Sequence, residues 1–388
     1  NYLKYYIFIM IFYSDITIIG AGIIGSSLAY HLSKLNNNKK IMLIDKQCIS
    51  SEASGLSAGT IWSPMKFSNK KIFEFKNKFY KEYLASGTIE IIKELEKKGY
   101  QTGWKQTGAL MFANTNSVHY LNNLYKKYKK EGFLINKITD PKTIEPELSN
   151  KNIQLAIFSP LSGYVNPSYL TNSFAEDAIK NGVVLKENME ITKLEKEKNN
   201  YNFKIESSNG DIIYTKKLVL ANGVHIPKLS NQLGVEVPII PIKGCIWISE
   251  EIFKLKTVLF SAESYSYWQK NKMDLHITHD KNNNLLTNHL YIRPSVFGSQ
   301  FGFFRKECDI NDYSIEENDI LANKNYLEKY IPNIKNISIG GYWTGIMPFS
   351  KDGSFIIKSI GNLHIIGGFG PSGIMHGPMA TKIFAETI

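Results

Sequence analysis

One stretch near the start of the chain, DITIIGAGIIGSSLAYHLSKLNNNKKIMLID (residues 15–45), constrains the fold more than any other. It predicts a strand, a glycine turn, a helix and a second strand that ends at an acid. In the G-x-G-x-x-G turn, Gly20 permits the tight bend, Gly22 lets a phosphate approach the backbone, and Gly25 lets the helix pack on the strand. The helix N-terminus favours an anion, and Asp45 is placed to accept hydrogen bonds from a ribose. We expect a bound dinucleotide, either NAD or FAD.

Short apolar strands recur far apart in the chain and indicate how its domains are built. The segments ITIIG, IMLID, LVLAN and LHIIG are uniformly apolar, which is typical of parallel strands buried on both faces of a sheet. With 388 residues, 43% of them hydrophobic, the chain can form two domains. We predict an α/β fold in which a Rossmann-like domain with a parallel central sheet is assembled from residues 10–84, 151–228 and 336–388. Residues 85–150 and 229–335 are predicted to form a mixed or antiparallel α+β substrate domain over the cofactor.

The composition argues against several classes of function. The formal net charge is +11, but the lysines are scattered among asparagine, isoleucine and tyrosine, so we expect no nucleic-acid partner. Cys48, Cys245 and Cys308 are far apart, which fits neither a disulfide framework nor a metal site. The apolar run at residues 5–13 is too short to span a bilayer and has no cleavage site. We expect no firm membrane anchor and a cytoplasmic or mitochondrial matrix protein. We also expect the residues ahead of Met10 to be an extension rather than part of the fold.

A second segment favours FAD over NAD. SEASGLSAGTIW (residues 51–62) follows Asp45 closely, where an NAD-binding domain would normally continue into a further helix. Its small residues let the backbone lie flat against a bulky group, and its N–H and hydroxyl groups can bind pyrophosphate oxygens. A third segment, NLHIIGGFGPSGIMHGPMATKIFAE (residues 362–386), predicts a strand that runs through a glycine-rich loop into a helix.

With these motifs the chain resembles the D-amino acid oxidase-like flavoprotein family, which includes glycine oxidase, sarcosine oxidase and sarcosine dehydrogenase. The resemblance continues through SPLSGYVNPSYLTNSFAEDAIKNGVVL, LVLANGVHIPKL, YIRPSVFG and WTGIMPFSKDG, in that order, and closes with GGFGPSGIMHGP. It implies FAD, with the final helix pointing its positive end at the pyrimidine side of the flavin, where it favours negative charge. The cofactor-binding residues that it implies are Gly20, Gly22, Ile23, Ile24, Gly25, Asp45, Lys46, Ser54, Ser57, Ala58, Gly59, Ile191, Ala221, Asn222, Gly223, Gly368, Phe369, Gly370, Pro371, Ser372, Gly373 and Ile374.

The same resemblance implies an FAD-dependent oxidoreductase that oxidises a C–H bond beside an amine nitrogen. The substrate would be a small amine or amino acid of the sarcosine, glycine or D-amino acid type. Hydride would pass to the flavin, water would hydrolyse the imine, and O2 or a quinone or other electron carrier would take up the electrons. Two alternatives stay open: a flavoprotein that assists assembly of a respiratory complex, and a 2-hydroxy-acid dehydrogenase of the same fold.

The chain departs from the family pattern where the family binds a substrate carboxylate. A buried carboxylate needs a charge-assisted partner, and the two family positions that supply a cation are here Met347 and Met375. Arg293 is the best remaining cation, because the sarcosine dehydrogenase-like branch has a comparable arginine, and Arg305 is a weaker candidate. We expect the catalytic residues to be Arg293, Tyr291 and Trp62, and the substrate pocket to include Met347, Met375 and Tyr265.

The resemblance also predicts that the flavin is not covalently attached. Sarcosine oxidase-like members use a cysteine at the position of Gly345, and no histidine flanks Trp62, where some dehydrogenases attach theirs. We therefore expect bound but dissociable FAD.

Overall fold

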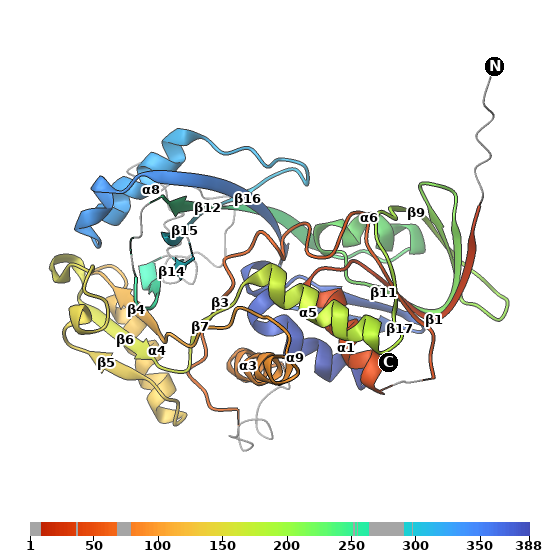
Figure 1. Ribbon diagram of the computed structural model, residues 1–388, viewed down its shortest axis with the longest axis horizontal. Helices are drawn as coiled ribbons and strands as arrows, with labels where there is room; N and C mark the ends of the chain where they lie inside the picture. Colours follow the sequence, from red (N-terminus) through yellow and green to blue (C-terminus); the bar gives the residue numbers. More distant parts are fainter. Residues whose placement is uncertain are drawn as a thin grey trace.

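The computed structural model describes residues 9–35, 38–67, 79–250, 253, 255–263, 291–296 and 298–388. Its strands form two large sheets in two units (Figure 1), together with one short ladder of β3 and β7. Tyr265, which was expected in the substrate pocket, lies outside the described residues. No helix among the described ranges is long and apolar enough to cross a membrane.

The first sheet is the nucleotide-binding sheet that the glycine turn predicts. Its strands are β17 (Ile356–Ile360), β18 (Leu363–Gly367), β11 (Ile212–Leu220), β1 (Ile11–Ile19), β2 (Ile41–Ile44) and β8 (Val184–Lys186), in that spatial order. All neighbours from β18 to β8 pair in parallel, and β17 is antiparallel to β18. An antiparallel pair, β9 (Ile191–Lys196) and β10 (Phe203–Ser207), extends from β11. The predicted parallel central sheet of an α/β fold is confirmed.

Alternation along β1 explains why the second half of the strand is mostly apolar. Ile16 and Ile18 pack under one helical layer, and Ile19 belongs to the cluster on the opposite face. Because both faces are covered there, the side chains of this half lie in a dry interior. The helices that cover these faces are α1 (Ile23–Leu35), α3 (Lys81–Lys97), α5 (Pro167–Lys180) and α9 (Gly373–Ala385) on the first and the short α6 (Ile226–Ser230) on the second.

The second sheet forms the other unit and is mixed, as predicted. Its strands are β16 (Ile339–Ser350), β12 (Ile239–Ser249), β15 (Gly298–Glu307), β14 (Tyr291–Ser295), β13 (Val258–Ser261), β4 (Ala109–Ala113), β6 (Leu155–Ser159) and β5 (Asn136–Ile138), in spatial order. The β13–β4 pair is parallel and the other described pairs are antiparallel. The helices α8 (Glu317–Glu328) and α4 (Val118–Lys130) contribute to its two apolar clusters.

The remaining elements are short. The ladder of β3 (Thr60–Ile61) and β7 (Gly163–Tyr164) is antiparallel. The 3-10 helices are η1 (Pro141–Thr143), η2 (Asn150–Asn152), η3 (Gly223–His225), η4 (Asn231–Leu233), η5 (Pro332–Asn336) and η6 (Gly370–Ser372).

Packing divides the chain differently from the expected domain boundaries. The helix α3 packs in the core of the nucleotide-binding unit, although most of it was assigned to the substrate domain. Conversely, β6 and β16 pair within the second sheet, although both were assigned to the nucleotide-binding domain. Leu229 and Leu233 pack on the first sheet rather than in the second unit. The physical reason is that pairing and apolar burial, rather than chain order, decide to which unit an element belongs.

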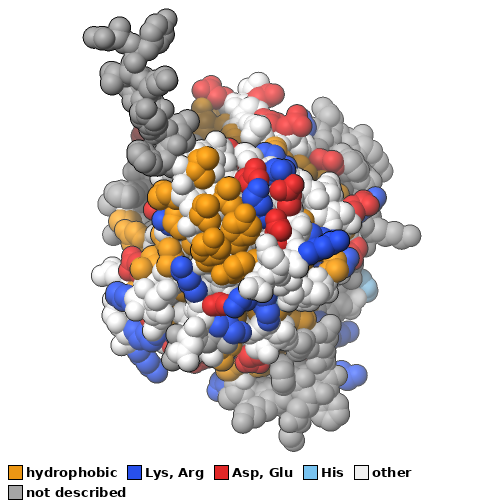
Figure 2. Space-filling view, turned by 90° about the vertical axis from the view of Figure 1, so that its right-hand side faces the viewer, with side chains coloured by type: hydrophobic (Ala, Val, Ile, Leu, Met, Phe, Trp, Pro, Cys, Tyr) orange, Lys and Arg blue, Asp and Glu red, His pale blue; other side chains and the backbone are white. Residues whose placement is uncertain are grey.

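Apolar side chains also gather on the surface at the end of the molecule away from the second sheet (Figure 2). On that side, β1 begins with the exposed residues Ile11 and Tyr13. The Tyr13 ring stacks on Tyr214 with 5.7 Å between ring centroids, and it also contacts Tyr201.

Candidate cofactor and substrate site

A cavity of about 980 Å³ is lined by residues of both units. Its nucleotide side consists of the turn after β1, residues 51–60, the loop after β11 and the loop before α9. Its other side, which we call the roof, is formed by cavity-facing residues of β12, β14, β15 and β16. The volume is near the upper end for ligand pockets, which suits a large cofactor and a small substrate together.

The glycine turn is so tightly packed that side chains cannot replace its glycines without movement. Gly20 has φ +105°, and a Cβ on it would lie 2.7 Å from the carbonyl oxygen of Ala221. A Cβ on Gly25 would lie 1.8 Å from the carbonyl oxygen of Gly20. Gly20 and Gly22 line the cavity, whereas Gly25 lies beneath them, where α1 meets β1.

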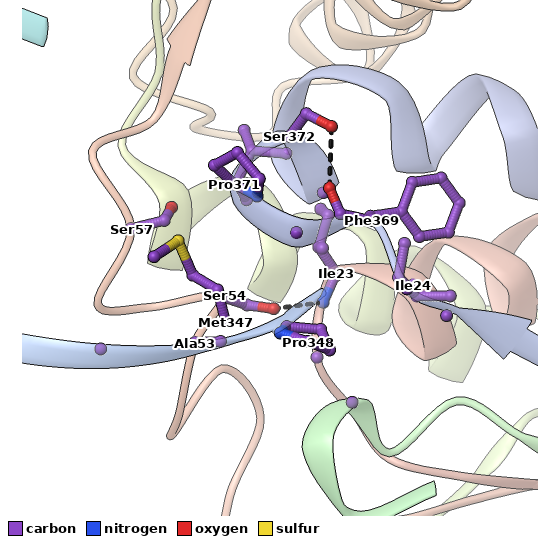
Figure 3. Close-up of a pocket in the computed structure, with 18 of the residues that line it drawn as sticks. Ile23, Ile24, Ala53, Ser54, Ser57, Met347, Pro348, Phe369, Pro371 and Ser372 are labelled. Carbon is purple, nitrogen blue, oxygen red and sulfur yellow. Dashed lines mark hydrogen bonds between the residues drawn. The ribbon is translucent and has the colours of Figure 1, made fainter. Parts of the chain in front are cut away.

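Ser54 joins the second segment to the start of α1. The Ile23 N–H donates to Ser54 Oγ over 2.9 Å (Figure 3). A Cβ on Gly22 would lie 2.9 Å from the same Oγ, so Gly22 leaves room for this contact. Residues that are 31 positions apart in the sequence thus form one wall of the cavity.

Asp45 is held in a fixed orientation at the end of β2. Its Oδ2 accepts from the Ala21 N–H over 2.7 Å, and its Oδ1 accepts from the Gln47 N–H over 2.9 Å. Burial raises the pKa of this carboxyl, and the two backbone hydrogen bonds oppose that shift. The carboxyl lines the cavity, so it is pre-oriented for a hydroxyl donor such as a ribose.

An ionic cluster that the sequence did not predict lies beside Asp45. Lys46 Nζ is 2.5 Å from Glu52, and His225 Nε2 lies 3.3 Å from the same carboxylate. Burial acts to raise the pKa of Glu52, but the hydrogen bonds from His225 and Lys46 outweigh it and lower the pKa to about 2. All three residues line the cavity. The sequence shows Glu52 within the segment SEASG, but its partner His225 comes from a distant loop, so the sequence does not indicate their contact.

The loop before α9 forms a further part of the nucleotide side, next to the start of α1. Gly368 and Gly370 have φ values of +68° and +52°, which favour glycine. Ser372 Oγ donates to the carbonyl oxygen of Phe369 over 2.9 Å (Figure 3). Phe369 forms an isolated backbone bridge with Phe349 of β16. α9 begins at Gly373, so its N-terminal N–H groups and dipole lie at the cavity wall.

Two buried polar atoms in the lining support a ligand with donor groups. Of the residues that the structure describes, Ser57 and Asn222 line the cavity with Oγ and Oδ1 atoms that have no hydrogen-bond partner in the protein. Orphan buried polar atoms of this kind require an explanation, and a bound polar ligand provides one. The residues present therefore fit a dinucleotide that lies along the glycine turn, Ser57 and the loop after β11.

The far end of the cavity is mostly apolar and aromatic. Trp62 meets Phe260 edge-on, with 5.7 Å between ring centroids. Tyr291, which was predicted to be catalytic, lines the same cavity, as do Met347 and Met375, which were predicted for the substrate pocket. His376 is also in the lining, and burial lowers its pKa to about 3, so the imidazole is neutral at neutral pH.

Arg293, the expected substrate cation, is not among the described residues that line the cavity. Its Nε donates to the carbonyl oxygen of Ala58 over 2.5 Å, and an Nη donates to that of Pro294 over 3.0 Å. The guanidinium lies over the Tyr164 ring, 4.9 Å from its centroid, and burial lowers its pKa to about 10. This geometry makes Arg293 a support of the cofactor-facing loop, whereas Arg305, the weaker candidate, lines the cavity.

Nearly all of the residues predicted to bind the cofactor line this one cavity. They are Gly20, Gly22, Ile23, Ile24, Asp45, Lys46, Ser54, Ser57, Ala58, Gly59, Ile191, Ala221, Asn222, Gly223, Gly368, Phe369, Gly370, Pro371, Ser372, Gly373 and Ile374. Further lining residues that the sequence did not single out include Glu52, Lys81, Glu82, Tyr128, His225 and Lys228.

Comparisons with known proteins agree with this geometry. Residues 15–387 match the protein family described as FAD dependent oxidoreductase. Glycine oxidase of Geobacillus kaustophilus is 20% identical over 386 residues, which cover 96% of this chain and 92% of that protein. Mouse mitochondrial sarcosine dehydrogenase is 23% identical over 248 residues, 62% of this chain but only 26% of that protein. The chain thus spans about a quarter of the length of the first curated relatives that it matches. The crystal structure of L-proline dehydrogenase from P. horikoshii superposes with a TM-score of 0.80 at 22% identity, covering 97% of this chain and 93% of that one.

Proposed function

Because the chain belongs to the FAD-dependent oxidoreductase family, we propose that it oxidises a C–H bond beside the nitrogen of a small amine or amino acid. The observation that carries the proposal is the single cavity in which the glycine turn, residues 51–60 and the loop before α9 meet under the roof. Glycine oxidase, sarcosine dehydrogenase and L-proline dehydrogenase are named for substrates of this class, which supports the choice.

When bound, FAD would accept the hydride of the C–H bond beside the nitrogen. The substrate would leave as an imine, which water would hydrolyse to a carbonyl compound and an amine, and O2, a quinone or another electron carrier would take up the two electrons. No protein nucleophile or metal ion is required for this sequence of events.

The chain's own residues would bind and orient the reactants. Asp45 would accept hydrogen bonds from the adenosine ribose, and Ser57 with Asn222 would bind polar groups of the cofactor. The N-terminus of α9 would stabilise negative charge that develops on the neighbouring side of the flavin. Trp62, Tyr291, Met347 and Met375 would exclude water from the reacting carbon.

Anaerobic reduction of the purified flavoprotein tests this proposal. The visible absorbance of oxidised flavin should bleach on addition of sarcosine, glycine, a D-amino acid or L-proline, with free FAD as the unreactive control. Bleaching by 2-hydroxy acids alone would replace the amine with an alcohol substrate. Absence of bleaching by either class would refute the oxidase or dehydrogenase activity and favour a role in assembly of another complex.

A further inference from the structure

Arg305 is a buried cation that faces the cavity from the roof. It lies near the end of β15, its residue is 5% exposed, and it is part of the cavity lining. Its guanidinium carbon lies 5.7 Å from the centroid of the Phe349 ring. A guanidinium that lines a cavity can bind an anionic group of a ligand through charge-assisted hydrogen bonds.

A β-bulge turns this side chain toward the cavity. Before the bulge, Gly302 is opposite Ile246 on the cavity side, and Phe303 is opposite Cys245 on the far side, in the core of the second unit. The register then shifts, so that Arg305 is opposite Gly244. One extra residue on β15 thereby returns the chain to the cavity side at Arg305, because a bulge reverses the alternation of side chains.

The strand next to Arg305 carries a glycine at the same level. Gly244 of β12 is paired with Arg305 on one side and with Gly345 of β16 on the other, and both glycines line the cavity. Gly244 therefore places no side chain beside Arg305, whereas Leu56 packs over Gly345, 3.2 Å from the position of a Cβ there. Met347, two residues beyond Gly345, lines the same cavity on the same strand. Arg305 and Met347 thus belong to one surface.

The other cations of the described lining come from the nucleotide side. Lys46 follows β2, Lys81 begins α3, and Lys228 lies in α6. Among the described residues of the roof, Arg305 is consequently the one that brings a positive charge to the cavity. A small substrate held between the flavin position and the roof would meet this charge.

We propose that Arg305 binds the carboxylate of the substrate, in place of a cation at Met347. This inference rests on the proposed function and narrows its substrates to amines that carry a carboxylate. The planar guanidinium can donate two parallel hydrogen bonds to a carboxylate. The anchor is displaced by two strands, from β16 to β15, and Gly244 on the intervening strand β12 has no side chain beside Arg305.

Binding of acetate to the oxidised holoprotein tests the assignment without turnover. Acetate carries the carboxylate but no amine, and acetamide is its uncharged counterpart. Each is titrated into the wild-type protein, Arg305→Met and Arg305→Lys, with the change in flavin visible absorbance as the readout. Lys306→Met is the matched control, because it removes a neighbouring but exposed charge from the same strand. FAD content is measured for every variant.

We expect Arg305→Met to weaken acetate binding by about tenfold or more, while acetamide binding and FAD content stay at wild-type values. Arg305→Lys should retain part of the acetate affinity, and Lys306→Met should retain all of it. Equal acetate affinity in wild type and both Arg305 variants would overturn the proposal. Loss of FAD from Arg305→Met would also overturn it, because the cation would then serve the cofactor. If no amine bleaches the flavin but acetate binding still depends on Arg305, the amine oxidation fails and the anion site stands.

Discussion

Replacing Gly25 with alanine tests the glycine turn sharply, because the contact it creates lies between backbone and Cβ. The new Cβ would lie 1.8 Å from the carbonyl oxygen of Gly20 and 3.0 Å from its carbonyl carbon. Neither atom belongs to a side chain that can rotate away. To regain ordinary van der Waals contact, α1 must therefore move away from β1 by roughly 1.5 Å.

The expected destabilisation follows from two opposing effects. Overpacking of a tight core costs about 1–3 kcal/mol, and the backbone contact favours the upper end. The higher helix propensity of alanine offsets roughly 1 kcal/mol, which leaves a loss of about 2 kcal/mol. At about 2–4 °C for each kcal/mol, the midpoint of thermal unfolding should fall by roughly 4–8 °C. FAD content should fall as well, because the turn at Gly20 and Gly22 moves with the helix.

Thermal unfolding followed by circular dichroism and by flavin fluorescence measures both effects. Gly341→Ala is the matched control: it adds the same methyl group to a position where the nearest side-chain atom is 3.8 Å away. A Gly25→Ala protein with wild-type FAD content and an unchanged unfolding midpoint would refute the argument that this glycine is required by helix–strand packing.

Three further predictions concern charges and the cofactor. The pKa of Glu52 is about 2 in the folded chain, below its ordinary value of 4.5, so the stabilisation that Glu52 provides is present above about pH 4.5 and is lost as the pH falls toward 2. Glu52→Gln should therefore lower the free energy of unfolding at pH 7 and flatten the pH dependence of that free energy between about pH 4.5 and 2. An unchanged pH profile would contradict this. Acid-denatured protein should release all of its FAD on ultrafiltration, because Gly345 stands where a cysteine would attach the flavin; flavin retained with the polypeptide would show a covalent bond. Arg293→Met should weaken FAD binding by roughly tenfold, because it removes the hydrogen bond to the Ala58 carbonyl; an unchanged Kd for FAD combined with lost acetate binding would instead make Arg293 the substrate cation.

The nucleotide-binding half was predictable because its signals are local. The glycine turn and Asp45 occur within one strand–helix–strand unit, and each glycine meets a specific steric requirement. The apolar strands identified a sheet covered on both faces. The place of α3 was not predictable in this way, because its apolar face packs on α9, nearly 300 residues further along the chain.

The place of Arg305 in the cavity lining was not predictable from the sequence, for a reason of register. Regular alternation along β15 would place Arg305 on the side of the strand opposite Gly302, that is, in the apolar core. Only the bulge, which depends on pairing with β12, reverses that side. The contact between His225 and Glu52 was equally hidden, because it joins two loops whose proximity follows from the finished sheet.

The long strand β16 has a mechanical consequence. It pairs with β12 over nearly its whole length, and near its end Phe349 is bridged to Phe369 of the loop before α9. A rotation of the second unit as a rigid body would strain this bridge and shift the loop next to the flavin position. Entry and exit of small molecules are therefore better served by displacement of individual surface segments than by hinged opening of the two halves.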